Sequence, residues 1–174
     1  GFSGSIYATK PTFDLISITL MDSAKINHFE DGFLALYSKG DVEDTLRQVV
    51  TVDYGSEFKV GEFYVSFNDA GHILGAGSLL VSDSSAPSGQ REIIFSGDLG
   101  NTPQDIVRPT EYYWHGDFVV MESTYGDRNH PQENVAELIQ KEINAVEKTR
   151  GTLIIPSFAV ERTQDLLYII KMLK

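Results

Sequence analysis

The chain has 174 residues, and its 14 Lys and Arg against 25 Asp and Glu give a formal net charge of −11 at pH 7. It contains no cysteine, which excludes a disulfide scaffold, a thiolate metal site and a cysteine nucleophile. The acidic balance argues against nucleic-acid binding through bulk positive charge, although it is compatible with a local phosphate site built on metal cations.

The sequence carries no membrane or targeting signal. No segment approaches the ~18 consecutive apolar residues of a membrane span. Residues 1–4 lack the basic and apolar regions of a signal peptide, and the first residue is Gly rather than Met. We therefore expect a cytoplasmic protein without membrane contacts, and a chain that begins within a longer protein or was processed or cloned from one.

Hydrophobic spacing predicts the elements of the first half of the chain. Apolar runs between Gly, Asp or Ser indicate strands, and apolar residues three and four apart indicate helices. In chain order these are a strand over 5–9, a helix over 12–24, a helix over 41–50 capped by Asp41, and a strand over 63–68. The polar stretch 82–89 predicts a hairpin loop between strands over 78–82 and 92–95.

The second half of the chain continues the mixture of strands and helices. Residues 118–121 are apolar throughout, as expected for a strand that is covered on both faces. A helix over 132–148, a strand over 152–155 and a helix over 162–174 follow. Interspersed strands and helices predict a layered α/β or α+β sandwich rather than a helix bundle.

Three of the predicted strands end in residues that can bind metal. His72 follows a strand end, and the small residues after it leave room for a metal ion or a phosphate beside the imidazole. Asp98 lies in a glycine-flanked turn, where a carboxylate can bridge two cations, and Glu122 follows the apolar strand 118–121.

Each of these residues also has an ordinary structural explanation. His72 could be a hydrogen-bonded structural histidine, Asp98 could cap its own turn, and Glu122 could pair with Arg128. Three successive strand ends with ligand-type residues nevertheless favour a functional site, because layered α/β folds build their sites there. His28 and His115 are expected to be structural or solvent-facing.

Five blocks in chain order resemble motifs of the beta-CASP branch of the metallo-β-lactamase fold. They read GSIYATKPT at 4–12, GHILGA at 71–76, FSGDLG at 95–100, MESTYG at 121–126 and PSFAVERTQ at 156–164. The resemblance covers nearly the whole chain and is nearest to prokaryotic RNA-processing nucleases. It implies an α/β fold arranged as an α+β layered sandwich. The chain would contain a partial metallo-β-lactamase αββα fold followed by the start of a beta-CASP domain.

The resemblance also implies roles for the three strand-end residues. His72 would bind one zinc ion, Asp98 would bridge two zinc ions, and both would be catalytic together with Glu122. Glu122 would be the first acid of the beta-CASP domain, which in the family orients a histidine near the leaving group. The family's His-x-His-x-Asp-His cluster, which supplies most of the zinc ligands, is expected upstream of Gly1.

Carried over to the whole chain, the resemblance predicts an internal fragment. Residues 1–150 would be the C-terminal portion of the metallo-β-lactamase-like domain, and residues 151–174 the first strand and helix of the beta-CASP domain. The parent would be a zinc-dependent hydrolase that cleaves RNA phosphodiester bonds in RNA processing or degradation. Two alternatives stay open: a DNA-processing beta-CASP nuclease, and a non-catalytic scaffold with the same fold.

A fragment of this kind is expected to lack activity by itself. Zinc sites use three or four protein ligands, and His72 and Asp98 are only two, so zinc binding should be weak. The missing upstream strands would leave an apolar sheet face or edge open. A homodimer is one way in which that surface could be covered.

Two residues near the C-terminal end are weaker candidates for substrate binding. Ser157 and Arg162 could contact an RNA phosphate, since a guanidinium offers two parallel donors. The structural alternative is that Arg162 pairs with Glu161 or Asp165.

Two further residues lie close to Glu122 in the sequence. Asp127 and His130 could support Glu122 through hydrogen bonds. The structural alternative for both is a solvated turn before Pro131.

Overall fold

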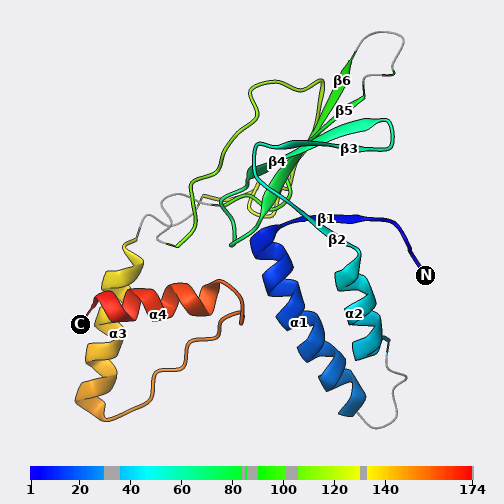
Figure 1. Cartoon of the computed structure of the whole chain (residues 1–174). Coiled ribbons are helices and arrows are strands. Elements are labelled where there is room, and N and C mark those ends of the chain that lie inside the picture. The colour runs from blue at the N-terminus through cyan, green and yellow to red at the C-terminus, as the bar shows by residue number, and fades with distance from the viewer. Residues whose placement is uncertain (30–35, 84, 86–89, 101–105, 130–132, 174) are drawn as a thin grey trace. The chain divides into compact units, whose positions relative to one another are not determined.

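The computed structural model describes all residues except 30–35, 84, 86–89, 101–105, 130–132 and 174 (Figure 1). It divides into two compact units, Gly1–Glu122 and Ser123–Lys174. Helices and strands are interspersed along the chain, which confirms the mixed α/β class. The domain boundary expected at residue 150 stays a prediction.

The N-terminal part of the first unit is a parallel strand pair with two helices. Strand β1 (Ile6–Thr9) is followed by α1 (Lys10–Phe29), α2 (Lys39–Arg47) and β2 (Val49–Val52), and β2 pairs in parallel with β1. The two helices lie side by side in Figure 1. The expected helix over 41–50 is therefore wrong at its end, because a β-branched run leaves the helix to pair with β1.

The start of α2 also differs from the prediction. Ser38 is the N-cap residue, and its hydroxyl accepts a hydrogen bond from the Asp41 amide at 3.3 Å. The Asp41 carboxylate in turn accepts the Ser38 amide at 2.7 Å, so the two residues form a reciprocal capping box. Asp41 is therefore the third residue of the helix within the capping box, and Ser38 rather than Asp41 is the N-cap residue.

A five-stranded sheet makes up the rest of the first unit. Its strands are β3 (Glu57–Val60), β4 (Phe63–Asp69), β5 (Gly77–Asp83), β6 (Arg91–Phe95) and β7 (Phe118–Val120), in that spatial order. Neighbours are antiparallel except β6 and β7, which are parallel. The pairing of β5 with β6 confirms the predicted hairpin, although most of its loop lies outside the described residues.

Aromatic stacking connects the two sheets. The Phe58 ring on β3 stacks on Tyr7 of β1, with ring centroids 4.7 Å apart, and on Phe67 of β4 at 5.7 Å. Val65 and Phe67 are buried on the same face of β4. Phe67 lies two residues before the end of β4, and that strand end leads into the candidate site.

The expectation that strand 118–121 is covered on both faces is wrong. β7 is an edge strand that pairs with β6 on one side, and Phe118, Val119 and Val120 are all more than half exposed. The faces of a strand are buried by layers packed above and below the sheet rather than by its in-plane neighbour, and the described residues leave the side chains of β7 largely uncovered. This exposure matches the expected open apolar edge, while the homodimer remains a prediction.

The second unit contains two helices that cross each other (Figure 1). Asn134 caps α3 (Val135–Thr149) by accepting hydrogen bonds from the amides of Ala136 and Glu137, and α4 (Arg162–Met172) follows. Residues 152–155 do not form the expected strand. A strand needs a neighbour for its backbone hydrogen bonds, and the described part of this unit contains none. No helix among the described residues is long and apolar enough to cross a membrane.

Candidate functional site

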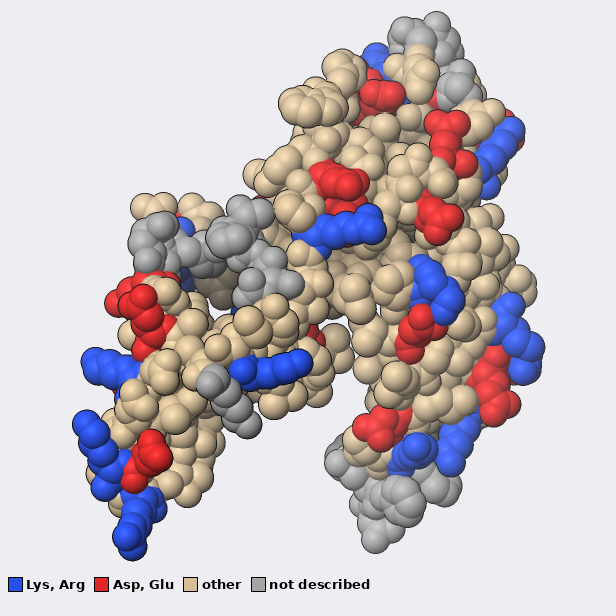
Figure 2. Space-filling model, turned by 60° about the vertical axis from the view of Figure 1, so that its left-hand side comes forward, with Lys and Arg blue, Asp and Glu red and all other residues tan. Residues whose placement is uncertain are grey.

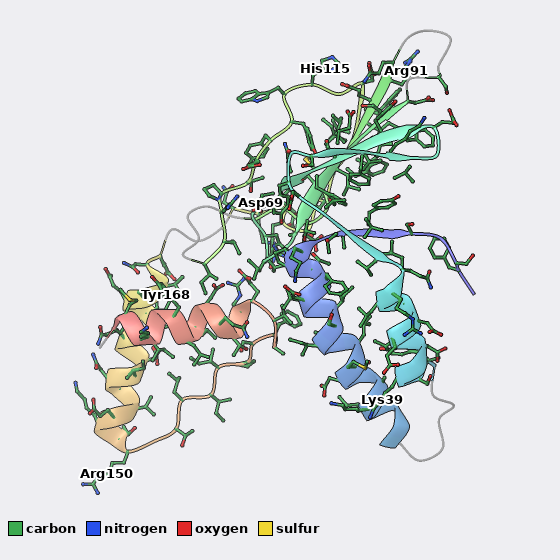
Figure 3. The ribbon with its side chains drawn as sticks, in the orientation of Figure 1. Lys39, Asp69, Arg91, His115, Arg150 and Tyr168 are labelled. Carbon is green, nitrogen blue, oxygen red and sulfur yellow. The ribbon has the colours of Figure 1, made fainter. Side chains whose placement is uncertain are left out.

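His72 lies in a tight turn between β4 and β5. Asp69, the last residue of β4, is buried, and its carboxylate accepts the Gly71 amide at 2.9 Å. Gly71 has φ of +64°, in the left-handed region that favours glycine. The turn closes where the Ala70 amide donates to the Ala76 carbonyl at 3.1 Å. Asp69 is labelled in Figure 3 at this end of β4.

The segment 108–111 holds the His72 turn from outside. The Thr110 hydroxyl donates to the Ala70 carbonyl at 3.0 Å, and the Glu111 amide donates to the Asp69 carbonyl at 2.8 Å. A Cβ at Gly71 would lie 2.6 Å from the Thr110 amide nitrogen, so only glycine fits there. The sequence gives no local signal for this role of Thr110, because the Ala70 carbonyl is 40 residues away in the chain.

Two tyrosine hydroxyls support the same region of the sheet. Tyr54 donates to the Ala76 carbonyl at 2.8 Å, and Tyr113 donates to the Ser66 carbonyl at 2.9 Å. Burial raises the pKa of both phenols, and the nearby Asp69 charge adds to the rise at Tyr54. Both hydroxyls therefore keep their protons, and remain hydrogen-bond donors, through neutral pH.

Asp98 lies in the turn that follows β6, and this turn packs directly on the His72 turn. The Gly100 amide donates to the Ala70 carbonyl at 2.8 Å. A Cβ at Gly100 would overlap the Gly71 carbonyl oxygen and lie 2.7 Å from the His72 amide nitrogen. The two turns are therefore in backbone-to-backbone contact, which fixes the spacing of the side chains they carry.

The structure brings His72 and Asp98 together. The Nε2 atom of His72 lies 4.0 Å from Oδ2 of Asp98, and their side chains are 40% and 75% exposed. Two ligands of one tetrahedral zinc ion lie ~3.4 Å apart, given bond lengths near 2.1 Å. A small movement of the exposed carboxylate would reach that spacing, so the pair fits zinc in donor type and placement. Among the described residues, no group of three or more His, Cys, Asp or Glu is placed to hold a metal ion.

Glu122 follows β7 and contacts the Asp98 turn. Its Oε1 atom accepts the Leu99 amide at 2.8 Å, and its own amide donates to the Ser96 hydroxyl at 3.0 Å. Arg128 is the residue that the structural alternative pairs with Glu122. Its guanidinium lies 3.0 Å from the Asp127 carboxylate. The structure thus places Glu122 beside the residue that follows Asp98.

The weaker candidates lie in the second unit. The Ser157 hydroxyl is 3.0 Å from that of Thr163, and the exposed Arg162 guanidinium is 3.7 Å from the Asp165 carboxylate. Arg162 therefore has one of the two partners that the structural alternative named. Asp127 is exposed and paired with Arg128, whereas His130 lies outside the described residues.

The remaining histidines lie apart from this site or outside the description. His115 is 78% exposed and pairs with Glu92 at 3.1 Å. It lies beside Arg91, toward the opposite end of the sheet from Asp69 (Figure 3). Its exposure confirms the solvent-facing prediction, whereas the side chain of His28 is outside the described part of the chain.

Acidic and basic side chains are interspersed on the face that Figure 2 shows. Local ion pairs along helices include Lys10 with Asp14 and Arg47 with Asp44. This distribution fits the acidic overall composition, since the visible described surface offers no continuous basic track for a phosphate backbone.

No family model matches the chain. It is similar to ribonuclease TTHA0252 of Thermus thermophilus, with 32% identity over 98% of this chain and 37% of that protein. Transcription termination factor FttA of Thermococcus kodakarensis is 29% identical over 98% of this chain and 26% of its own length. RNase aCSPSF2 of Saccharolobus solfataricus is 30% identical over 95% of this chain and 32% of its own length.

The chain thus spans about a third of the length of the curated relatives that it matches. Among solved structures, a protein of unknown function from Enterococcus faecalis V583 has a TM-score of 0.45 and 16% identity. That match covers 83% of this chain and 33% of the other, and the similarity is too low to assign a fold.

Proposed function

We propose that this chain, which is similar to two ribonucleases along nearly its whole length, forms part of a beta-CASP ribonuclease that depends on metal and hydrolyses RNA phosphodiester bonds. The observation that carries the proposal is the 4.0 Å approach of His72 to Asp98. This approach is produced by two turns whose backbones are hydrogen-bonded to each other. The proposal concerns the full-length protein, of which these residues supply one part of the site.

His72 and Asp98 are the residues that would hold zinc. Their imidazole nitrogen and carboxylate oxygen are both zinc ligands in proteins, and the second carboxylate oxygen of Asp98 leaves room for a bridge between two ions. Bound zinc would supply Lewis acidity and a nucleophile at neutral pH. Since two ligands are fewer than zinc sites use, residues 1–174 alone are expected to bind zinc weakly and to leave RNA intact.

The chain's own residues would position these ligands and the substrate. Glu122 accepts the Leu99 amide and so holds the turn that presents Asp98. In the second unit, Arg162 and Ser157 are exposed side chains with the donors that a phosphate needs. Asp127 and His130 are proposed only as supports for Glu122. An RNA substrate also fits a cytoplasmic location.

The test is RNA cleavage by the full-length protein, measured on matched RNA and DNA strands with and without a chelator. Asp98→Asn keeps the shape of the side chain but removes its charge, and we expect it to lower the rate of RNA cleavage by at least about 100-fold. Asp14→Asn, the same change at an exposed pair on α1, is the control and should leave the rate unchanged.

Other outcomes would contradict the proposal in recognisable ways. Cleavage of DNA with intact RNA would identify the DNA-processing alternative. An Asp98→Asn variant as active as Asp14→Asn would remove Asp98 from the reaction. A protein that binds RNA but never cleaves it, with or without added Zn²⁺, would support the scaffold alternative.

A further inference from the structure

Ser96 is buried at the junction between β6 and the Asp98 turn, with 6% of its surface exposed. Its hydroxyl accepts the Glu122 amide at 3.0 Å and donates to the Gly97 carbonyl at 2.6 Å. Its amide donates to the Val120 carbonyl at 2.9 Å. Ser96 therefore joins the end of β6 to the end of β7 through both its backbone and its side chain.

A second buried serine extends this connection to β5. Ser78 is 5% exposed, and its hydroxyl donates to the Ser96 carbonyl at 2.7 Å. We call Ser78 and Ser96 the serine pair. Through the serine pair the ends of three adjacent strands are hydrogen-bonded in series, and Asp98 and Glu122 follow directly after two of those ends.

The hydrogen bonds around Ser96 form a closed ring, which passes through the backbone of Asp98 and through Glu122. One link runs from the Ser96 hydroxyl to the Glu122 amide, and the other from the Glu122 carboxylate to the Leu99 amide. The segment 96–99, which carries Asp98, closes the ring. Both links act between the Asp98 turn and Glu122, in addition to the backbone bond from the Ser96 amide to the Val120 carbonyl. Loss of the Ser96 hydroxyl removes one of the two links and leaves that backbone bond in place.

We infer that Ser96 is a positioning residue for the proposed reaction, in that its hydroxyl fixes the placement of Asp98 relative to Glu122. This inference rests on the proposed function, because positioning matters only if the two acids act at one site. Packing alone does not require the hydroxyl, since alanine would fill nearly the same buried space. The hydroxyl is used instead for two hydrogen bonds that determine how the strand ends meet.

The test uses the full-length protein and measures its affinity for Zn²⁺ by competition with a chelator, together with kcat and KM on RNA. We expect Ser96→Ala to lower both the zinc affinity and kcat by about 10–100-fold, the range typical of residues that orient metal ligands, while KM stays within about threefold. Ser96→Thr keeps the hydroxyl and should recover most of both losses.

Ser82→Ala is the matched control. Ser82 is also a buried serine on β5, with 4% exposure, but it lies four residues beyond Ser78, at the opposite end of the strand from the serine pair. This variant should keep the zinc affinity and kcat of the unaltered protein. Equal behaviour of Ser96→Ala and Ser82→Ala would overturn the inference.

If Ser96→Ala does not fold, Ser78→Ala tests the inference in its place. It removes the support of the Ser96 carbonyl but leaves the Ser96 hydroxyl in place, so a smaller loss of zinc affinity in the same direction is expected. Unchanged zinc affinity in Ser78→Ala would then overturn the inference. Failure of the proposed function has a different signature, because Asp98→Asn would itself leave zinc affinity and RNA cleavage unaffected.

Discussion

Two glycines determine how closely the two turns of the candidate site approach each other. The Gly100 amide bonds to the carbonyl of Ala70, and the Cα of Gly100 lies against the carbonyl of Gly71. Neither position has room for a side chain. The spacing of His72 and Asp98 is therefore set by main-chain contact, which varies less than contact between flexible side chains.

We expect Gly100→Ala to lower the free energy of unfolding by about 3 kcal/mol, because the added methyl group overlaps backbone that cannot move aside. Thermal unfolding followed by circular dichroism measures this. Gly40→Ala on α2 is the control, since its Cβ would meet only the Ser38 hydroxyl at 3.6 Å. That change should be neutral or stabilising by up to about 1 kcal/mol. Similar stabilities of the two variants would contradict the tight contact.

At the same scale, the sequence predicts the ligand-type residues but not their supports. His72, Asp98 and Glu122 stand out because each follows a strand end, and strand ends can be recognised from local patterns. Thr110 and Ser78 act on carbonyls 40 and 18 residues away. Nothing local distinguishes them from surface hydroxyls, so their roles become visible only once the strands are paired.

At the scale of elements, local periodicity predicts most helices and hairpins. It fails where pairing with a strand that is distant in the sequence determines the secondary structure. The apolar stripe over 41–50 fits a helix, but Val49–Val52 pairs with β1, which lies about 40 residues earlier. The sequence does not predict β3, because its residues EFKV contain only two apolar side chains and no continuous apolar run. Residues 152–155 have strand composition but no partner strand among the described residues of their unit.

The cap of α2 gives a prediction about pH. The hydrogen bonds from Ser38 hold the pKa of the Asp41 carboxyl below its ordinary value of 3.8. The folded state thus favours the ionised form, so the stabilisation is present above that value and is lost as the pH falls through the lowered pKa. We expect Asp41→Asn to flatten the acid side of the stability profile, measured by urea unfolding at several pH values.

Asp44→Asn is the control for this experiment, since Asp44 lies on the same helix and pairs with Arg47 outside the capping box. Ser38→Ala removes the cap hydroxyl and should cost about 1 kcal/mol at neutral pH. A Ser38→Ala variant with unchanged stability would mean that α2 contributes little to the cooperative unfolding of the first unit.

At the scale of the whole molecule, the two units differ in how much they bury. The first unit contains buried residues on β1, α1, α2, β4 and β5, whereas no described residue of Ser123–Lys174 is buried. Helices held by few buried contacts open readily, because little apolar surface must be exposed. The two units should therefore differ in local stability.

Amide hydrogen exchange followed by mass spectrometry tests this difference. Peptides from α3 and α4 should exchange much faster than peptides from β4 and β5, whose amides are paired along a seven-residue ladder. Slow exchange in α3 that matches the sheet would show that the second unit is stabilised by contacts other than its own.

The parallel pairing of β7 with β6 has a consequence for the order of folding. Hairpins such as β4–β5 close over short loops, whereas β7 must cross 22 residues after Phe95 to reach β6. Longer loops cost more entropy to close, so long-range pairings tend to form late. We expect pulse-labelled exchange during refolding to protect β4, β5 and β6, whose connecting turns include His72 and Asp98, before β7. The proposed pair of metal ligands would then form in a folding intermediate to which Glu122 is added last.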